Sequence, residues 1–310
     1  MPGHDLEPFA NRLKKNARHF HRWAKARGLG AYRLYDRDIP GFPFMVDWYD
    51  GRVQFTELTR SASTEARREA ALAIITEVLS IPADRVFSKT REPKVWGREQ
   101  YERMETAEPF EVEEQGLRFW VELSGHLDTG LFLDHRVTRA RVRDEAKGAR
   151  VLNLFAYTGA FTVYAAAGGA SSTVSVDLSN TYLTWAQRNM ALNGLEKGDH
   201  RWIRSDARAW LQEAPRRPER FDLVVLDPPS FSSSKGMKGT FDVQRDQTAM
   251  LEDAVSLLSP SGRLYFSTHY RGFELAAESS ALGHFEELTP KSIPDDFQRK
   301  DIHRCWRITR

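Results

Sequence analysis

A run of four apolar residues, Leu223 to Leu226, ends in an aspartate and two prolines, and this run limits the possible folds most. Its apolar residues do not alternate with polar ones, which is typical of a strand covered on both faces in a parallel sheet. Pro228 and Pro229 have no N–H to donate to a sheet, so the strand ends at Asp227. Ligands of open parallel sheets bind beyond the carboxyl ends of the strands. Asp227 is therefore placed for chemistry, although a plain turn would explain a single Asp-Pro.

From residue 150 the sequence alternates predicted strands and helices, which predicts an α/β domain with a doubly wound, Rossmann-like sheet. The last two strand-like segments have no predicted helix between them, so we expect an antiparallel hairpin at one sheet edge. The predicted strands are 150–157, 173–177, 200–206, 221–227, 262–268, 284–290 and 303–310.

The first part of the chain has a different pattern, which predicts a small α+β domain. A helix is predicted over 8–27 and another over 63–80, with Asp50-Gly51 marking a hairpin between them. Residues 85–103 are polar and basic and are expected to form a loop, and residues 109–123 a second hairpin. We expect a small α+β domain over 1–105, a β-hairpin connector over 106–135 and the α/β domain over 136–310.

Composition excludes several classes of protein. No apolar run approaches the ~18 residues of a membrane span, and the start of the chain has no apolar signal segment. A single cysteine, Cys305, excludes an internal disulfide framework and a cysteine-based zinc cluster. We therefore expect a cytoplasmic protein without a metal site.

Residues 11–37 carry nine Lys and Arg against one acid, with aromatic residues between them. Such a stretch suits a nucleic-acid surface, where cations meet phosphate and rings stack on bases. A helix face charged for solubility explains it equally well. The candidate RNA-binding residues are Arg12, Lys14, Lys15, Arg18 and Arg22, with Lys235 and Lys238 in the loop after Asp227.

Three predicted strands of the α/β domain end in an aspartate: Asp177, Asp206 and Asp227. Asp177 is placed to accept hydrogen bonds from ribose hydroxyls, and Asp206 from an adenine amino group. Helix N-capping explains Asp206 and Ser179 as well, and capping does not exclude ligand contact. The first strand–helix turn has one glycine, Gly159, so the three-glycine dinucleotide fingerprint is absent.

Several motifs together carry a family resemblance: "LDTGLFLDHR", "LNLFAYTGAFTVYAAAGGA", "VDLSNTYLTWAQRNMALNGL", "LDPPSFSSSK", "FDVQRD" and "RGFEL". They resemble class I S-adenosylmethionine (SAM) methyltransferases, and more closely the RlmK-type module. That module is the carboxyl half of the bifunctional 23S rRNA guanine methyltransferase of bacteria. The resemblance implies a small RNA-binding domain before a SAM-dependent methyltransferase domain. It also implies methylation of a guanine nitrogen-7 in 23S or precursor rRNA. The family's other half is missing, so the chain is either an excised part of a fusion or a stand-alone version, in which case a separate protein would match the missing half.

The resemblance also implies roles for individual residues. Arg136 would pair with the methionine carboxylate of SAM, although this residue could instead face solvent. Phe231 would stack on an extruded base, beside Asp227, Pro228 and Pro229. The cofactor-binding residues implied are Arg136, Asn153, Phe155, Ala156, Tyr157, Gly159, Asp177, Leu178, Ser179, Asp206, Ala207 and Asp227.

The residues also bear on which atom receives the methyl group. Methylation of carbon-5 of a pyrimidine requires covalent attack by a cysteine. In similar proteins with that activity a cysteine lies near the strand "LYFST", where this chain has Ser267, Thr268 and His269. Carbon-5 methylation is therefore not expected. Guanine nitrogen-7 has a free lone pair and needs no general base, only placement. The alternatives are methylation of an exocyclic amine (guanine N2 or adenine N6), a nicotinamide-dependent oxidoreductase, and a catalytically inactive RNA-binding protein.

Overall fold

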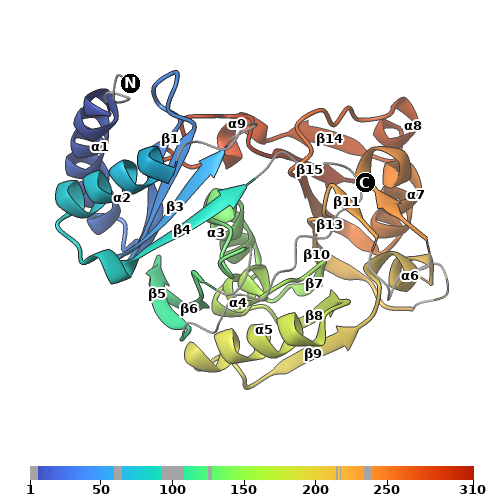
Figure 1. The fold of residues 1–310 in the computed structure, drawn as a ribbon. Coiled ribbons are helices and arrows are strands. Elements are labelled where there is room, and N and C mark those ends of the chain that lie inside the picture. The colour runs from blue at the N-terminus through green and yellow to red at the C-terminus, as the bar shows by residue number, and fades with distance from the viewer. Residues whose placement is uncertain are drawn as a thin grey trace. The chain divides into compact units, whose positions relative to one another are not determined.

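The computed structural model of the chain (Figure 1) describes residues 6–58, 65–91, 108–124, 128–213, 216, 218–233 and 239–310. The chain forms two compact units. The first comprises Met1–Thr129 and Asp295–Arg299, and the second Gly130–Pro294 and Lys300–Arg310. The described part of the predicted connector at 106–135 is thus shared between the two units.

In the first unit, two helices pack against a four-stranded sheet. The elements are α1 (Glu7–Lys25), β1 (Ala31–Asp36), β2 (Phe44–Tyr49), β3 (Arg52–Leu58), α2 (Glu65–Leu79), the 3₁₀ turn η1 (Ala83–Arg85) and β4 (Val86–Arg91). The strands follow in the order β1-β2-β3-β4, and only β3 and β4 are parallel. Phe9 of α1 packs edge-on against Phe44 of β2, with ring centroids 5.1 Å apart, and Ile75 of α2 joins the same core.

Both predicted hairpins are present. Asp50 and Gly51 join β2 to β3 with φ of 45° and 83°, and two positive φ angles in a row match the hairpin turn that an Asp-Gly pair favours. The second hairpin, β5 (Phe110–Glu114) and β6 (Leu117–Val121), turns in the same way. The expected loop over 85–103 was wrong in its first part, since residues 86–91 form β4. This strand lies at the sheet edge, where polar residues are common and hide the strand pattern.

A segment from late in the chain completes the core of the first unit. Asp296 and Phe297 are each 2 % exposed. The Asp296 carboxylate accepts a hydrogen bond of 2.9 Å from the backbone N–H of Arg33 on β1. The Arg33 guanidinium lies 4.4 Å from the centre of the Phe297 ring. The buried Arg33 is therefore held by residues more than 260 positions away in the sequence, as well as by its ion pair with Asp47.

The second unit has a seven-stranded sheet in the order β14-β15-β13-β10-β7-β8-β9. The strands are β7 (Arg150–Leu154), β8 (Ser172–Asp177), β9 (Asp199–Arg204), β10 (Phe221–Leu226), β13 (Leu258–Thr268), β14 (His284–Glu287) and β15 (Arg304–Thr309). Strands β13, β10, β7, β8 and β9 are parallel neighbours. The chain runs outward from β7 through β8 to β9, then restarts at β10 on the other side of β7. A topological switch point, where ligands of such sheets bind, therefore lies between β7 and β10.

Helices cover both faces of this sheet (Figure 1). The helices are η2 (Leu133–His135), α3 (Arg136–Glu145), α4 (Ala160–Ala167), α5 (Asn180–Leu192), α6 (Ala207–Gln212), α7 (Val243–Ser256), α8 (Ala277–Ser280) and α9 (Thr289–Ser292). Leu223 and Val225 of β10 pack with residues of α3 and α4, whereas Val224 and Leu226 pack with residues of α6 and α7. Both faces of β10 are thus buried, which explains why its apolar run does not alternate and confirms the predicted α/β sheet.

The predicted antiparallel hairpin at the sheet edge is also confirmed. Strand β15 lies between β13 and β14 and runs antiparallel to both. The short helix α9 separates β14 from β15, where no helix was expected. Because β15 is antiparallel to β13, its first residue lies beside the last residue of β13: Arg304 is paired with Thr268. Residues before β15 therefore reach the same edge as residues after the parallel strands.

Candidate active site

Asp227 follows β10 at the switch point and has two polar neighbours. The Ser267 hydroxyl donates a hydrogen bond of 2.6 Å to Asp227 Oδ1, and His135 Nε2 lies 3.2 Å from Asp227 Oδ2. Burial alone would raise the pKa of Asp227, but the charges of His135 and His269 and the Ser267 hydrogen bond hold this pKa well below its usual range. The carboxylate is therefore ionised at neutral pH and can only accept hydrogen bonds.

Three histidines and a second aspartate lie next to Asp227, and we call Asp134, His135, His269 and His303 the histidine cluster. Asp134 Oδ2 accepts a hydrogen bond of 2.9 Å from His269 Nε2 and lies 2.8 Å from His303 Nδ1. The rings of His135 and His303 are stacked, with centroids 4.6 Å apart. Asp134, His135 and His303 are buried, whereas the His269 side chain is 35 % exposed.

The cluster is electrostatically coupled. Burial raises the pKa of Asp134, but the charges of His269 and His135 outweigh this and hold the pKa well below its usual value. Burial lowers the pKa of His303, against the opposing effect of Asp134. The Asp134 carboxylate therefore stays ionised in an almost dry environment.

No role was predicted for individual residues of the histidine cluster. His269 directly follows β13 and His303 directly precedes β15, so the antiparallel pairing of these strands brings both histidines to one edge. Asp134 and His135 come from η2, directly before α3. The signal available in the sequence was the antiparallel final strand, which was predicted but not used to place His303.

The turn from β7 to α4, implied as the cofactor loop, has an unusual backbone. Phe155 and Tyr157 have φ of 57° and 50°, in the left-handed region that few non-glycine residues adopt. Asp177 Oδ2 accepts a hydrogen bond of 2.8 Å from the Tyr157 N–H, and the Ala156 N–H donates to the Val176 carbonyl at 3.1 Å. The end of β8 therefore fixes the shape of this turn.

Asp177 also organises the turn that follows β8. Its Oδ1 accepts a hydrogen bond of 2.8 Å from the Ser179 N–H, and the Ser179 hydroxyl in turn caps α5 by accepting from the Tyr182 N–H. Burial raises the pKa of Asp177 despite hydrogen bonds from Ser179, Tyr157 and Leu178. Asp177 remains partly accessible, so both carboxylate oxygens are held in place at the edge where a ligand is expected.

The structure gives a reason for glycine at position 159 that the sequence did not reveal. It is the N-cap of α4 with φ of 72°, and a Cβ built on it would lie 2.5 Å from the Cβ of Ala186 in α5. The glycine therefore permits close packing of α4 on α5, and the close approach of a ligand stays a prediction.

Asp206 acts as the N-cap of α6, as the alternative interpretation held. Its Oδ1 accepts a hydrogen bond of 3.0 Å from the Arg208 N–H. Ala207 begins the helix and is buried. An adenine contact by Asp206 stays a prediction. It is compatible with the N-cap role, because the carboxylate has further lone pairs that can accept a hydrogen bond.

Two implied cofactor residues with polar side chains, Asn153 and Arg136, are buried. Asn153 is 2 % exposed and donates a hydrogen bond of 3.0 Å to the Thr162 hydroxyl, which ties β7 to α4. Arg136 is 3 % exposed at the start of α3, so the alternative in which it faces solvent does not hold.

The segment before α3 is tied to the cofactor loop. The Gly130 N–H donates to the Tyr157 hydroxyl at 2.9 Å, and the Thr158 hydroxyl donates to the Gly130 carbonyl. Phe132 contacts Tyr157 and His269, with ring centroids 5.2 and 5.5 Å apart. Residues 130–135, the cofactor loop and the histidine cluster thus form one connected rim.

The segment after Asp227 begins with a rigid exit. Pro228 is buried and Pro229 is exposed. Phe231 is half-buried and begins β11 (Phe231–Ser232), which pairs with β12 (Phe241–Asp242). Lys235 and Lys238, the predicted phosphate contacts of this loop, lie outside the described residues.

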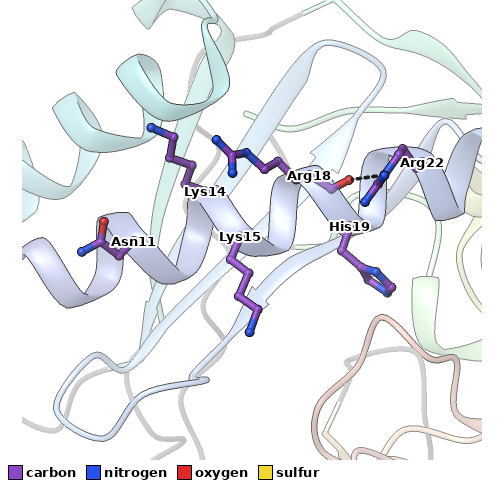
Figure 2. Close-up of a pocket in the computed structure, with 6 residues that line it drawn as sticks. All are labelled: Asn11, Lys14, Lys15, Arg18, His19 and Arg22. Atoms are coloured by element: carbon purple, nitrogen blue, oxygen red, sulfur yellow. Dashed lines mark hydrogen bonds between the residues drawn. The ribbon is translucent and has the colours of Figure 1, made fainter.

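Four of the five predicted RNA-binding residues of the first unit, Lys14, Lys15, Arg18 and Arg22, gather along one side of α1, as Figure 2 shows. A hollow on this side is lined by Asn11, Lys14, Lys15, Arg18, His19 and Arg22, which we call the α1 stripe. Its residues recur every three or four positions, the spacing of a single helix face, and those with cationic side chains are exposed. Arg12 is half-buried and outside the stripe. The opposite face of α1, including Leu13 and Phe20, is buried in the core.

Comparisons with known proteins agree with this geometry. The family model described as S-adenosylmethionine-dependent methyltransferase matches residues 90–275. Ribosomal RNA large subunit methyltransferase K of Neisseria meningitidis serogroup B is 47 % identical over 99 % of this chain and 88 % of the relative. Ribosomal RNA large subunit methyltransferase K/L of Methylococcus capsulatus is also 47 % identical, but the chain spans 43 % of that longer protein.

Solved structures agree on the fold. A SAM-dependent methyltransferase from Streptococcus mutans superposes with a TM-score of 0.81 at 24 % identity, over 99 % of this chain and 82 % of that one. No helix among the described residues is long and apolar enough to span a membrane.

Proposed function

The chain belongs to the family of S-adenosylmethionine-dependent methyltransferases, and from this premise we propose that it methylates nitrogen-7 of a guanine in 23S ribosomal RNA. The observation that carries the substrate is the 47 % identity with the Neisseria ribosomal RNA methyltransferase over almost the whole chain. The ionised, acceptor-only carboxylate of Asp227 at the switch point supports the choice of base. The alternative of a nicotinamide-dependent oxidoreductase is excluded, because the cofactor of this family is SAM.

The cofactor, SAM, supplies a methyl group on a positively charged sulfur. The cofactor loop fits such a group because its left-handed residues Phe155 and Tyr157 are partly exposed beside the partly accessible Asp177. We propose that Asp177 holds the ribose, that Asp206 and Ala207 hold the adenine, and that the buried Arg136 pairs with the carboxylate of the methionine end.

We propose that Asp227 positions the guanine and stabilises the charge that develops on it. Nitrogen-7 attacks with its own lone pair, so no proton has to leave and no general base is needed. The purine becomes cationic as the bond forms, which makes its N1–H and exocyclic amine stronger hydrogen-bond donors. A fixed, ionised carboxylate that accepts from these donors therefore stabilises the transition state more than the ground state.

Pro228, Pro229 and Phe231 complete the proposed base pocket. The rigid prolines present their carbonyl oxygens beside Asp227, and the half-buried Phe231 offers a ring on which an extruded base can stack. Nitrogen-7 faces the deep and narrow major groove of an RNA helix, so a paired guanine must leave the helix to react.

We propose that the first unit, which includes the α1 stripe, holds the RNA outside the active site. The exposed side chains of Lys14, Lys15, Arg18 and Arg22 can contact successive phosphates without reading sequence. This assigns RNA binding to the small α+β part of the chain and catalysis to the α/β part.

Nucleoside mass spectrometry of 23S rRNA tests the proposed function. RNA from a strain that lacks the protein is incubated with the purified chain and SAM, then digested and mapped. A new 7-methylguanosine at one position is expected. A new N2-methylguanosine or N6-methyladenosine would instead support the exocyclic-amine alternative, and no methylated nucleoside would support an inactive RNA-binding protein.

A further inference from the structure

We propose that the histidine cluster binds a zinc ion that fixes the rim beside Asp227. The cluster offers three imidazole nitrogens and one carboxylate oxygen, and these four donor atoms lie within 4.8 Å of one another. Imidazole with carboxylate is a donor set that suits Zn²⁺. The expectation of no metal site rested on the single cysteine of the chain, and this site contains no cysteine.

The distances within the cluster are close to those of a tetrahedral site. Bonds of about 2.0–2.2 Å place donor atoms roughly 3.3–3.6 Å apart in a tetrahedron. Asp134 Oδ2 lies 2.8 Å from His303 Nδ1, 2.9 Å from His269 Nε2 and 4.0 Å from His135 Nε2. These values bracket the tetrahedral distance, so small side-chain rotations would bring the four atoms around one ion.

His303 is held on both sides of its ring. Nδ1 lies 2.8 Å from Asp134 Oδ2, and Nε2 lies 2.8 Å from the Ser292 hydroxyl, which also lies 2.9 Å from the Thr289 carbonyl. With zinc on Nδ1, the Nε2–H would donate to Ser292 Oγ, and the Ser292 hydroxyl would donate to the Thr289 carbonyl.

The same contact is typical of metal-binding histidines. Such a residue usually donates its other ring N–H to an oxygen, which fixes the ring and its tautomer. Ser292 provides this oxygen for His303. His135 provides a further argument: it is 1 % exposed, its Nε2 lies 3.2 Å from Asp227 Oδ2, and its Nδ1 has no hydrogen-bond partner. A buried ring nitrogen without a hydrogen-bond partner is costly, and a small rotation of the His135 ring towards a bound ion would change its partners.

We assign this ion a structural role. The four donors come from η2, from the residue after β13 and from the residue before β15, so one ion would join three separate segments. His135 and Ser267 are also the neighbours of Asp227. Fixing these segments would fix the carboxylate that positions the base, whereas nitrogen-7 methylation itself needs no Lewis acid.

Zinc titration of the chelator-treated full chain tests the proposal. We expect one equivalent of Zn²⁺ to bind with a dissociation constant on the order of 10 nM or tighter, and the melting temperature to rise. Co²⁺ should give the visible absorption of a four-coordinate site without a thiolate band. His269→Ala, at the partly exposed ligand, should weaken binding about 100-fold or more. His284→Ala, at an exposed histidine of β14, is the matched control and should bind normally.

Three results would overturn the proposal: no zinc retained by the wild-type chain after dialysis, equal zinc affinity in His269→Ala and wild type, or ¹⁵N chemical shifts that show both His303 nitrogens protonated and unchanged by zinc. The last measurement uses the wild-type chain, so it decides the matter even if a variant fails to fold. None of these readouts depends on methyl transfer.

Discussion

At the scale of single residues, the three strand-end aspartates have different surroundings. Asp177 and Asp206 accept hydrogen bonds from backbone N–H groups and shape the turns that they end. Asp227 instead faces side chains, Ser267 and His135, which leave part of the carboxylate accessible. Its ionisation is secured by neighbouring side chains rather than by the backbone, which suits the positioning role that we propose for it.

Replacing Asp227 with asparagine should therefore reduce turnover more than binding. One acceptor oxygen becomes an N–H₂ donor that opposes the donors of guanine, and we expect the rate of methyl transfer to fall about 100- to 1,000-fold. The affinity for RNA should change little. Single-turnover assays with equilibrium binding check this, with Glu252→Gln on the exposed side of α7 as control. Turnover within twofold of wild type in Asp227→Asn would remove the proposed role.

The sequence predicted strand-end acids better than it predicted the histidine cluster. An aspartate at the end of an apolar run can be placed from local pattern alone, because the run and its prolines define the strand. His303 comes before a strand rather than after one, so its position depends on the direction of β15 and on long-range pairing with β13. Asp134 and His135 lie in a 3₁₀ turn without a periodic pattern.

At the scale of elements, the packing of α4 on α5 depends on Gly159. Replacement with alanine would strain the left-handed backbone and also force the new methyl group against Ala186. Gly194 has a similar φ of 65° but no atom within 4 Å of a Cβ, so it provides a matched control for the backbone strain alone.

We expect Gly159→Ala to lower the free energy of unfolding by about 2–4 kcal/mol and Gly194→Ala by about 1 kcal/mol. Urea unfolding followed by circular dichroism measures both. Equal losses in the two variants would show that the contact with Ala186 relaxes at no cost.

The α1 stripe can be changed without touching the core, because its side chains lie opposite the buried face of the helix. We expect Lys15→Ala with Arg18→Ala to weaken RNA binding and to reduce the slope of log affinity against log salt by about 1 to 2. Lys197→Ala with Arg216→Ala, exposed residues of the second unit, is the control and should leave the slope unchanged. An unchanged slope in the α1 double variant would support the solubility interpretation.

The element pattern was predictable where burial is complete and less so at edges. Strand β10 is buried on both faces and gives an unbroken apolar run, whereas the edge strand β4 has the sequence "VFSKTR", which is as polar as a loop. Helix α1 was expected over 8–27 and spans Glu7–Lys25, because its cap residues leave no sharp signal at either end.

At the scale of the whole molecule, buried weak acids in both units limit stability at high pH. Burial raises the pKa of Cys305 in the second unit from 9.0 to about 12, and mainly burial raises the pKa of Tyr35 in the first unit from 10.0 to about 12. Above pH 9 the unfolded chain loses these protons before the folded chain does, so folding stability falls as pH rises towards 12.

Between its pKa in the unfolded chain and its pKa in the folded chain, each of these groups should lower the free energy of unfolding by about 1.4 kcal/mol per pH unit. Urea unfolding between pH 8 and pH 11 measures the slope. Cys305→Ala should make the slope shallower from pH 9 upward, and the variant should retain methyl transfer because no covalent cysteine step is proposed. A slope that is identical in the variant would show that the thiol ionises equally in both states.

The segment 295–299 has a consequence for how the polypeptide can be divided. Any fragment that stops before it lacks Asp296 and Phe297, so the guanidinium of Arg33 loses its aromatic cover and a backbone N–H of β1 loses its acceptor. During synthesis, the core of the first unit is complete only after residues 295–299 have been made. Expressing the amino-terminal 129 residues alone would thus yield a domain whose core lacks Asp296 and Phe297. Adding a separate peptide of residues 295–299 should restore the contacts of these two residues with Arg33.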